Sequence, residues 1–316
     1  MLTLGGYVSN TVATRTTTGA IKFKMHKIPS ANSQPYICVS GPDHQLWFCE
    51  SGTSKIGRFN VAEASFDEFA IPEQNAMPIG ITPGADGNMW FCAKKANKIG
   101  RVNLSGSIKL FPLPTADAGP DGTLVGPDGN VWFSETDAGQ IGRITPGGDI
   151  TEFKDGITPA SKPLSIASRD GMMWFSEAAG NQIGCITMEG KVTEYSIPSH
   201  DSQPRAMATH LDGSIWFVET STNALGRIDR NGKITERPVA TPNSSLRGVC
   251  VAPDGDIWYT ANFANKIGRM KPDGTVVGEY SIPEPNAGAR CIMAWPDGRL
   301  FFTAFDGGFI GEVIPQ

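Results

Sequence analysis

A pattern of apolar and polar residues recurs along the chain about every 42 positions. In each copy, a short apolar run with a large aromatic residue leads through a polar loop to Ile-Gly-Arg or a variant of it, as in residues 131–145. The aromatic positions are 43, 42, 42, 42, 42 and 43 residues apart: Trp47, Trp90, Trp132, Trp174, Trp216, Trp258 and Phe301. A period of about 40–45 residues built from strand-like segments is typical of a four-stranded β-propeller blade. The sequence therefore predicts seven blades.

Each copy contains four strand-like segments in the same order. A short segment after a proline predicts an inner strand, and an Asp-Gly turn, a strong hairpin signal, precedes the strand that carries the aromatic residue. Ile-Gly-Arg predicts a third strand, and a polar–apolar alternation such as residues 192–198 predicts an outer strand. The predicted fold is all-β, with four-stranded antiparallel blades.

The two ends of the chain complement each other. Residues 20–28 alternate like an outer strand, whereas the chain ends just after the third strand of the seventh copy, at residues 314–316. We therefore expect the N-terminal strand to complete the last blade and close the ring, so that no sheet edge stays unpaired. Residues 1–18 carry no repeat and are expected to form a flexible tail, which leaves residues 19–316 as one propeller domain.

Composition narrows the possible partners. A net charge of −5 without a basic face argues against nucleic acid and anionic membranes. No apolar run approaches the ~20 residues that cross a bilayer, and the N-terminus lacks the features of a secretory signal. The six cysteines form no CxxC pair and are expected to be reduced hydrophobic residues. We expect a cytoplasmic protein that is a monomer or a weak homo-oligomer.

Residues common to the copies are expected to be structural. The aromatic residues should pack between blades, and the arginines of Ile-Gly-Arg should bridge strands or neighbouring blades. These arginines are Arg58, Arg101, Arg143, Arg227 and Arg269. Cys185 and Glu312 take their place in the fourth and seventh copies.

The candidate site consists of positions that differ between blades at one mouth of the channel. Because the first two strands are antiparallel, the residue after the inner-strand proline and the residue three past the aromatic lie at the same end. The first set is Tyr36, Ile79, Asp121, Leu164, Arg205, Arg247 and Arg290. The second set is Glu50, Ala93, Glu135, Glu177, Glu219, Ala261 and Ala304.

The predicted mouth is polarised. Three successive blades supply Arg205, Arg247 and Arg290, and Asp121, Glu135, Glu177 and Glu219 come from the neighbouring arc. Tyr36, Ile79, Leu164 and the loop residues Phe263 and Phe305 add apolar wall. Such a mouth suits a small, mostly apolar molecule whose carbonyl, enolate or phenolate oxygen faces the arginines. Alternatively, the charges pair across blades and only close the channel.

Other catalytic motifs are absent from the sequence. It contains no Ser-His-Asp set, phosphate-binding glycine loop, HxH or HExxH, and only His200 of the four histidines falls on a connection at the mouth. Glutamate oxygens suit Mg²⁺, but no motif requires it. We expect no required cofactor, with Mg²⁺ as the alternative if the protein is a lyase.

The repeat Trp-Phe-(Ser/Thr/Cys)-Glu-x₅-Ile-Gly-Arg-Ile-Thr, with Pro-x-Gly-Ile-Thr inner strands and Glu-Tyr-x-Ile-Pro outer strands, resembles the virginiamycin B lyase family over about residues 20–314. The resemblance implies a seven-bladed propeller that linearises a cyclic depsipeptide, a streptogramin B, by metal-assisted elimination. It also implies a histidine base, two glutamates that hold Mg²⁺, and a second histidine. The corresponding residues here are Arg290, Gly288, Ala304 and Arg247. Arginine, with a pKa above ~12, cannot act as the base, so we expect no linearisation of a streptogramin B, with or without Mg²⁺.

The leading hypothesis is a natural-product enzyme on this scaffold. It would orient a reactive intermediate for cyclisation or a pericyclic addition, while Arg205, Arg247 and Arg290 polarise a carbonyl. Fungal hetero-Diels–Alderases that act on tropolone quinone methides are similar in fold. Two alternatives are a lyase with a rearranged site, using Glu135, Glu177 or Glu219 as base or metal ligand, and a non-enzymatic propeller that binds a ligand or a protein.

Overall fold

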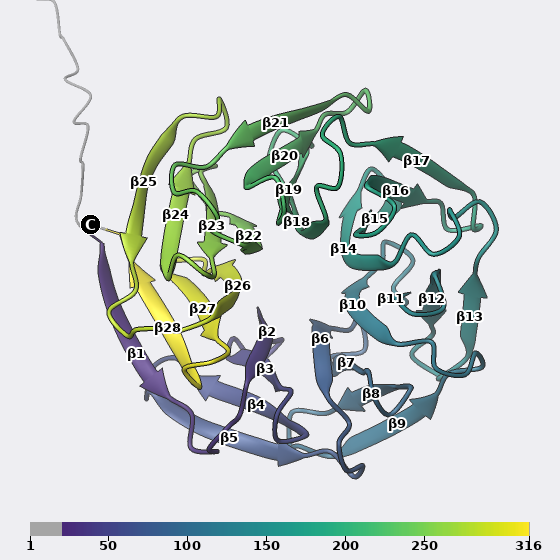
Figure 1. The fold of residues 1–316 in the computed structure, drawn as a ribbon. Coiled ribbons are helices and arrows are strands. Elements are labelled where there is room, and N and C mark those ends of the chain that lie inside the picture. The colour runs from purple at the N-terminus through teal and green to yellow at the C-terminus, as the bar shows by residue number, and fades with distance from the viewer. Residues whose placement is uncertain (1–20, 316) are drawn as a thin grey trace, which may run out of the picture.

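The computed structural model describes residues 21–315, which form seven four-stranded antiparallel sheets arranged in a ring (Figure 1). This confirms the predicted seven-bladed propeller. Within residues 21–315, no helix is long and apolar enough to cross a membrane.

The four strands of each blade run from the channel to the rim. The inner strands are β2 (Pro35–Ser40), β6 (Pro78–Pro83), β10 (Pro120–Val125), β14 (Pro163–Arg169), β18 (Pro204–Thr209), β22 (Leu246–Val251) and β26 (Ala289–Ala294). The aromatic strands are β3 (Leu46–Glu50), β7 (Met89–Ala93), β11 (Val131–Glu135), β15 (Met172–Glu177), β19 (Ile215–Glu219), β23 (Ile257–Ala261) and β27 (Leu300–Ala304). The third strands are β4 (Lys55–Asn60), β8 (Lys98–Val102), β12 (Gln140–Ile144), β16 (Gln182–Ile186), β20 (Ala224–Ile228), β24 (Lys266–Met270) and β28 (Phe309–Ile314). The outer strands are β5 (Ser65–Ala70), β9 (Ile108–Pro112), β13 (Ile150–Phe153), β17 (Val192–Ser196), β21 (Ile234–Pro238), β25 (Val276–Ser281) and β1 (Lys22–Lys27).

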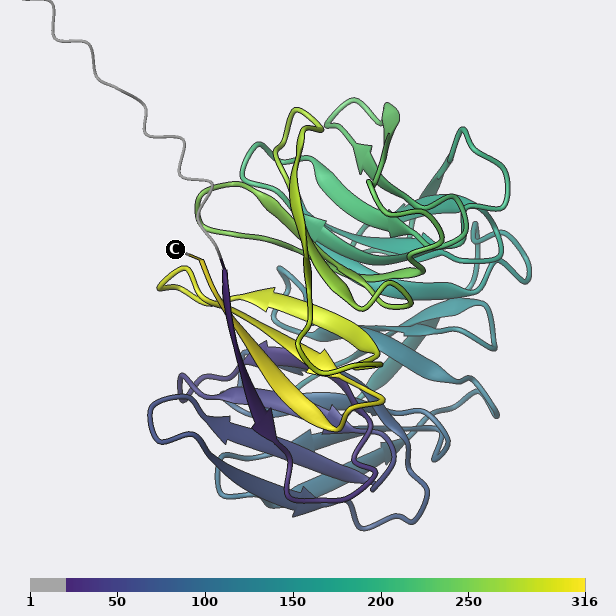
Figure 2. The ribbon, with the colours of Figure 1, turned by 60° about the vertical axis from the view of Figure 1, so that its left-hand side comes forward.

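The N-terminal strand closes the ring. β1 pairs antiparallel with β28, from Lys22 opposite Ile314 to Lys27 opposite Phe309 (Figure 2). Phe23 and Met25 pack against the core between the sixth and seventh blades, and Ile28, just past β1, is buried between the seventh and first blades. The prediction that this strand completes the last blade is confirmed. The expected tail, residues 1–18, lies outside the described residues.

The repeat residues hold neighbouring blades together. Trp47 is buried with Ile81 and Phe91 of the next blade, and its ring stacks on Phe69 of its own outer strand at 5.6 Å between centroids. The Arg58 guanidinium lies over the Trp47 ring at 5.4 Å and donates a hydrogen bond to the Leu104 carbonyl of the next blade. Both structural expectations are therefore met.

The two blades that lack the repeat arginine obtain a guanidinium from elsewhere. In the fourth blade, Arg169 at the end of β14 lies 3.7 Å from the centre of the Trp174 ring and donates a 3.1 Å hydrogen bond to the Asp229 carbonyl. In the seventh blade, Arg299 lies over Phe301 and donates a 2.8 Å hydrogen bond to Glu312. Each of these two blades thus has a guanidinium over its aromatic ring, although its third strand lacks the repeat arginine.

Candidate functional site

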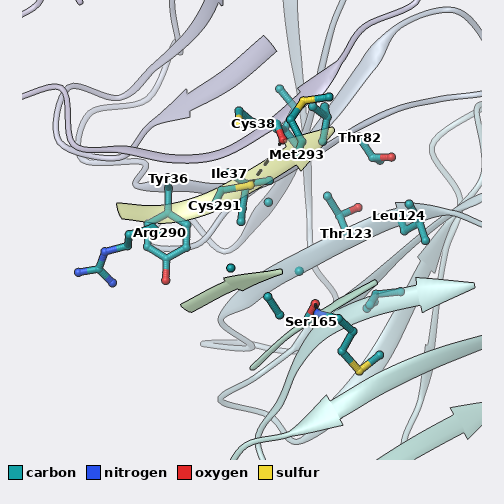
Figure 3. A pocket seen from close by; sticks show the side chains of 18 of the residues that line it. Tyr36, Ile37, Cys38, Thr82, Thr123, Leu124, Ser165, Arg290, Cys291 and Met293 are labelled. Atoms are coloured by element: carbon teal, nitrogen blue, oxygen red, sulfur yellow. Dashed lines mark hydrogen bonds between the residues drawn. The ribbon is translucent and has the colours of Figure 1, made fainter. Parts of the chain in front are cut away.

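The seven inner strands enclose a channel with a volume of about 430 Å³. Its wall is largely apolar, with Ile81, Leu124, Ile166, Val249 and Ile292 among its side chains. Figure 3 shows part of this wall, including Tyr36 and Arg290. Such a volume and lining are typical of a small-molecule site.

A β-bulge directs the variable residues into the channel. In the first blade, Pro35 pairs with Glu50 and Cys38 with Phe48, so that two residues, 36 and 37, oppose only one. The same register shift occurs at the start of every inner strand. A bulge bends its strand and redirects side chains. It places six residues of the first expected set in the channel lining: Tyr36, Asp121, Leu164, Arg205, Arg247 and Arg290.

Ile79 is placed differently from its expected position at the mouth. It is only 2% exposed and is not among the channel-lining residues, to which its strand contributes Gly80, Ile81, Thr82 and Pro83. A Cβ at Gly80 would lie 2.2 Å from the Asp121 carbonyl of the next inner strand, so only glycine fits this close approach. At this level of the channel the wall is formed by the backbone of Gly80 and not by the Ile79 side chain.

Three arginines from successive inner strands lie at the mouth. Arg205, Arg247 and Arg290 are half-buried, form no salt bridge among residues 21–315, and have buried Nε atoms without a hydrogen-bond partner. Burial and, after it, the positive charges of Arg205 and Arg290 lower the pKa of Arg247 to about 10. An unpaired, partly desolvated cationic cluster favours an anionic or strongly polarised oxygen.

Aromatic rings orient one of these arginines. The Arg290 guanidinium lies 4.0 Å from the centre of the Phe305 ring and 5.3 Å from that of Tyr36. The two rings meet edge to face at 5.9 Å between centroids. The structure therefore brings together three residues of the candidate site, Tyr36, Arg290 and Phe305. Phe263, by contrast, is 76% exposed and does not line the channel.

The acidic member of the mouth is neutralised by a residue that sequence reasoning missed. Lys94 Nζ lies 2.6 Å from Asp121 Oδ2. At the same repeat position, Ser51, Thr136 and Thr220 donate hydrogen bonds to an inner-strand carbonyl of the next blade. The sequence does carry a signal for this residue, because Lys94 stands at a repeat position that has a small hydroxyl residue in other blades. Because Lys94 and Asp121 form an ion pair with each other, the net positive charge of the mouth comes from the three arginines.

The glutamates expected at the mouth do not face the channel. Glu135, Glu177 and Glu219 are fully buried. Side chains alternate along a strand, so Glu135 shares a face with Phe133 and lies over Gly142, where a Cβ would be 2.8 Å from Glu135 Oε1. These carboxyl groups are at the expected end of the blade but one strand away from the channel. The expectation that these three glutamates face the mouth is therefore wrong, whereas Asp121 does line the channel.

Each buried glutamate lies near a second glutamate on the outer strand. Glu152, which pairs with Gly142, accepts hydrogen bonds from the Thr115 backbone and hydroxyl of the incoming connection. Burial, reinforced by the nearby Glu152 carboxylate, raises the pKa of Glu135 to about 8, although the hydrogen bond from the Gln140 amide opposes the shift. The same arrangement raises the pKa of Glu177 to about 8 and those of Glu50 and Glu219 to about 7. At neutral pH the four glutamate side chains are therefore protonated to a large extent. They lie in the interior of the blades and do not line the channel.

The free energy of unfolding is expected to fall as the pH rises from about 5 to 8. In the unfolded chain the four glutamates ionise near the ordinary glutamate pKa of 4.5, whereas in the folded chain they keep their protons up to about pH 7–8. Their contribution is therefore fully present below the unfolded pKa and is lost as the pH rises through the folded pKa. Each pKa unit of difference is worth about 1.4 kcal/mol. Thermal unfolding measured across this range checks the prediction.

Glutamine substitutions identify the groups responsible. Glu135→Gln and Glu177→Gln should flatten the pH dependence of the melting temperature, and the exposed Glu63→Gln should leave it unchanged. A wild-type melting temperature that is constant or rises between pH 5 and 8 would contradict this assignment.

Comparisons with known proteins agree on one family. The sequence profile described as the virginiamycin B lyase family matches residues 5–168 and 155–316. A streptogramin B lyase structure has 32% identity and a TM-score of 0.89 and covers 94% of this chain and 98% of its own. A catalytically inactive virginiamycin B lyase from Staphylococcus aureus, crystallised with quinupristin, has 32% identity and a TM-score of 0.89, with 94% and 100% covered. A Kuenenia stuttgartiensis hydrazine synthase, at 13% identity and a TM-score of 0.73, shares the fold, with 98% and 99% covered. No curated protein sequence matches the chain.

Proposed function

The chain belongs to the virginiamycin B lyase family, and from that premise we propose that it is a natural-product enzyme that binds a mostly apolar, oxygenated small molecule at the channel mouth. Its reaction is a cyclisation or a pericyclic addition of the hetero-Diels–Alder type. Arg205, Arg247 and Arg290 polarise a carbonyl oxygen of the substrate, and the channel wall holds the two reacting ends together.

One observation carries this proposal: three arginines that form no salt bridge within the part of the chain the structure describes lie at the mouth of an apolar channel. Donors that are already oriented, in a site that excludes water, stabilise a developing negative charge without further reorganisation. Fixing the two reacting ends replaces an encounter in solution and contributes up to roughly 7–11 kcal/mol. Neither effect needs a base.

A hetero-Diels–Alder addition needs only hydrogen-bond donors and a binding surface, which the arginines and the channel wall supply. A heterodiene, C=C–C=O, meets an alkene, one C–C and one C–O bond form, and two of the three π bonds are consumed. No proton or electron enters or leaves. Charge accumulates on the carbonyl oxygen in the transition state, where the guanidinium N–H groups donate hydrogen bonds to it. The apolar wall keeps water from adding to the electrophilic carbon.

The Mg²⁺ that the family implies does not fit the residues present. At the two expected ligand positions stand Gly288, whose Cβ position would clash with the Asp306 carboxylate, and the buried Ala304. The three arginines repel a cation, and Asp121 is held by Lys94. Within residues 21–315, no cluster of three or more metal-binding side chains forms. No step of the proposed reaction uses a metal ion.

An enantioselectivity assay tests the proposal. An ortho-quinone methide released in water from an ortho-hydroxybenzyl precursor is mixed with a cyclic alkene, and the dihydropyran adduct is separated on a chiral column. The background reaction is racemic, so we expect an excess of one enantiomer and a faster rate only with folded protein. A racemic product at the background rate over a panel of such dienes would overturn the proposal. Opening of a streptogramin B that stops on addition of a chelator would instead support the rearranged lyase.

A further inference from the structure

The half-buried arginines of the blades fall into two groups. Each repeat arginine, and Arg299 of the seventh blade, forms a salt bridge with an aspartate or a glutamate: Arg58, Arg101, Arg143, Arg227, Arg269 and Arg299. Arg205, Arg247 and Arg290 form none among the described residues 21–315, and residues 1–20 contain no aspartate or glutamate. Charges removed from water are usually paired in folded proteins. The three mouth arginines thus favour a counter-charge that a ligand brings.

The three guanidinium groups also repel one another. They stand at the second position of β18, β22 and β26, which are neighbours in the ring. Burial and, after it, the charges of Arg205 and Arg290 lower the pKa of the middle residue, Arg247. The pair of Lys94 and Asp121 adds no net charge to the mouth. A neutral carbonyl oxygen does not offset this repulsion, whereas a formally anionic group does.

The backbone at the mouth favours a carboxylate over a phosphate. Phosphate sites are commonly lined by free backbone N–H groups. Here, the N–H groups just inside the mouth donate hydrogen bonds to hydroxyl groups of the aromatic strands: Gly122 to Ser134, Ser165 to Ser176, Gly248 to Thr260 and Cys291 to Thr303. Recognition of charge is therefore left to side chains. The two oxygens of a carboxylate match the planar N–H fork of an arginine.

The channel below the arginines accepts an apolar body. Val249 and Ile292, two positions after Arg247 and Arg290 on the same strands, line it. The arginines and the apolar wall thus follow each other along one strand, from the mouth inward. A molecule held at the arginines by an anionic end therefore places its remaining atoms against apolar side chains.

We propose that the substrate is an apolar carboxylic acid, whose carboxylate accepts hydrogen bonds from Arg205, Arg247 and Arg290 while its body fills the channel. That the acid is a substrate rests on the proposed function, whereas its binding rests on the arginine cluster and the channel alone. Three guanidinium groups have more N–H donors than one carbonyl oxygen can accept. They can therefore hold the carboxylate and the reacting carbonyl together when the two are neighbours, as in a 2-oxo-3-enoate, C=C–C(=O)–CO₂⁻.

Calorimetric titration of the full chain at neutral pH tests the recognition of the acid. 2-Naphthoate and 2-naphthamide share an apolar body and differ in charge, and 2-naphthyl phosphate changes the anion. 2-Naphthoate should bind at least about tenfold more tightly than the amide, as expected for hydrogen bonds to a charged group, and more tightly than the phosphate. Acetate, which has no apolar body, should bind much more weakly. Equal affinity for the acid and the amide, or preference for the phosphate, would overturn the proposal.

Substitution of Arg205 locates the binding site. Arg205→Gln should weaken binding of 2-naphthoate by about tenfold or more and leave binding of the amide unchanged. The matched control is Arg227→Gln, because Arg227 is paired with Asp212 and does not line the channel; it should bind 2-naphthoate like wild type. An equal loss of acid affinity in both variants would overturn the site. The comparison of acid and amide in wild type does not depend on how well either variant folds.

The enantioselective addition separates this inference from the proposed function. A 2-oxo-3-enoate and its methyl ester, each mixed with the same alkene, differ only in the charge beside the reacting carbonyl. The acid should react with a kcat/KM at least about tenfold higher than that of the ester, mainly through a lower KM. Equal catalysis of both would overturn the acid as the substrate class and leave the proposed reaction in place. Tight binding of 2-naphthoate without catalysis of either diene would support the acid site and overturn the proposed reaction.

Discussion

Deletion of residues 1–28 is expected to abolish the cooperative unfolding transition of the propeller. The deletion removes β1, which pairs with β28 along six residues, and exposes that edge. It also removes the buried Ile28 and the packed side chains of Phe23 and Met25. Fully burying a large apolar side chain contributes about 1.5–3 kcal/mol. The loss of Ile28, together with smaller contributions from the partly buried Phe23 and Met25, is therefore a large share of a typical net stability of roughly 5–15 kcal/mol. The loss of the β1–β28 hydrogen bonds adds to this.

Circular dichroism melts and size-exclusion chromatography measure the effect. The exposed edge of β28 should also promote association with other copies. The control is deletion of residues 1–18, which keeps β1 and should melt like the full chain. A synthetic peptide of residues 20–30, added to the longer deletion, should recover part of the transition. If the longer deletion melts like the intact chain, closure by β1 does not contribute to stability.

Substitution of the mouth arginines is expected to remove activity and leave the fold intact. Arg290→Ala and Arg247→Ala each delete an unpaired guanidinium that forms no salt bridge within residues 21–315. Loss of one such oriented donor costs about 2.7–4 kcal/mol, or ~10²–10³ in rate, in the enantioselective addition described above. Because the effect lies in the transition state, kcat should fall more than KM rises. Arg→Lys should restore only part of the rate, since a point charge does not reproduce the planar fork.

Arg143→Ala is the matched control. Its guanidinium lies over Trp132 at 5.2 Å and donates a hydrogen bond to the Met188 carbonyl of the next blade, so its loss should lower the melting temperature with little effect on the rate. The proposed role is contradicted if Arg290→Ala and Arg247→Ala lower the melting temperature but leave the rate of the addition unchanged.

A binding measurement separates anion recognition from catalysis. 4-Nitrophenolate should bind at the mouth, and its pKa should fall on binding because the arginines stabilise the anion. Binding that disappears in Arg247→Ala, without any catalysed addition by wild type, would leave a ligand-binding propeller as the function.

Some features of the mouth depend on contacts that no local pattern reveals. Asp121 was expected to oppose the arginines, but Lys94 from the preceding blade holds it. Glu135, Glu177 and Glu219 lie at the predicted end of each blade, yet strand alternation turns them away from the channel. In the fourth blade the repeat position is a cysteine, and Arg169 at the end of β14 places its guanidinium over the Trp174 ring instead.

The sequence alone determined the number of blades, the order of their strands and the closure by residues 20–28. Each of these follows from the spacing of turns and the alternation of apolar residues within about 42 positions, which are local properties of the chain. Only the tertiary structure decided which side chains reach the channel and which charges remain free. Those outcomes depend on a bulge at the start of each inner strand and on partners one blade away. Within residues 21–315, Arg205, Arg247 and Arg290 form no salt bridge, because the neighbouring glutamates are buried in the blades and Asp121 is paired with Lys94.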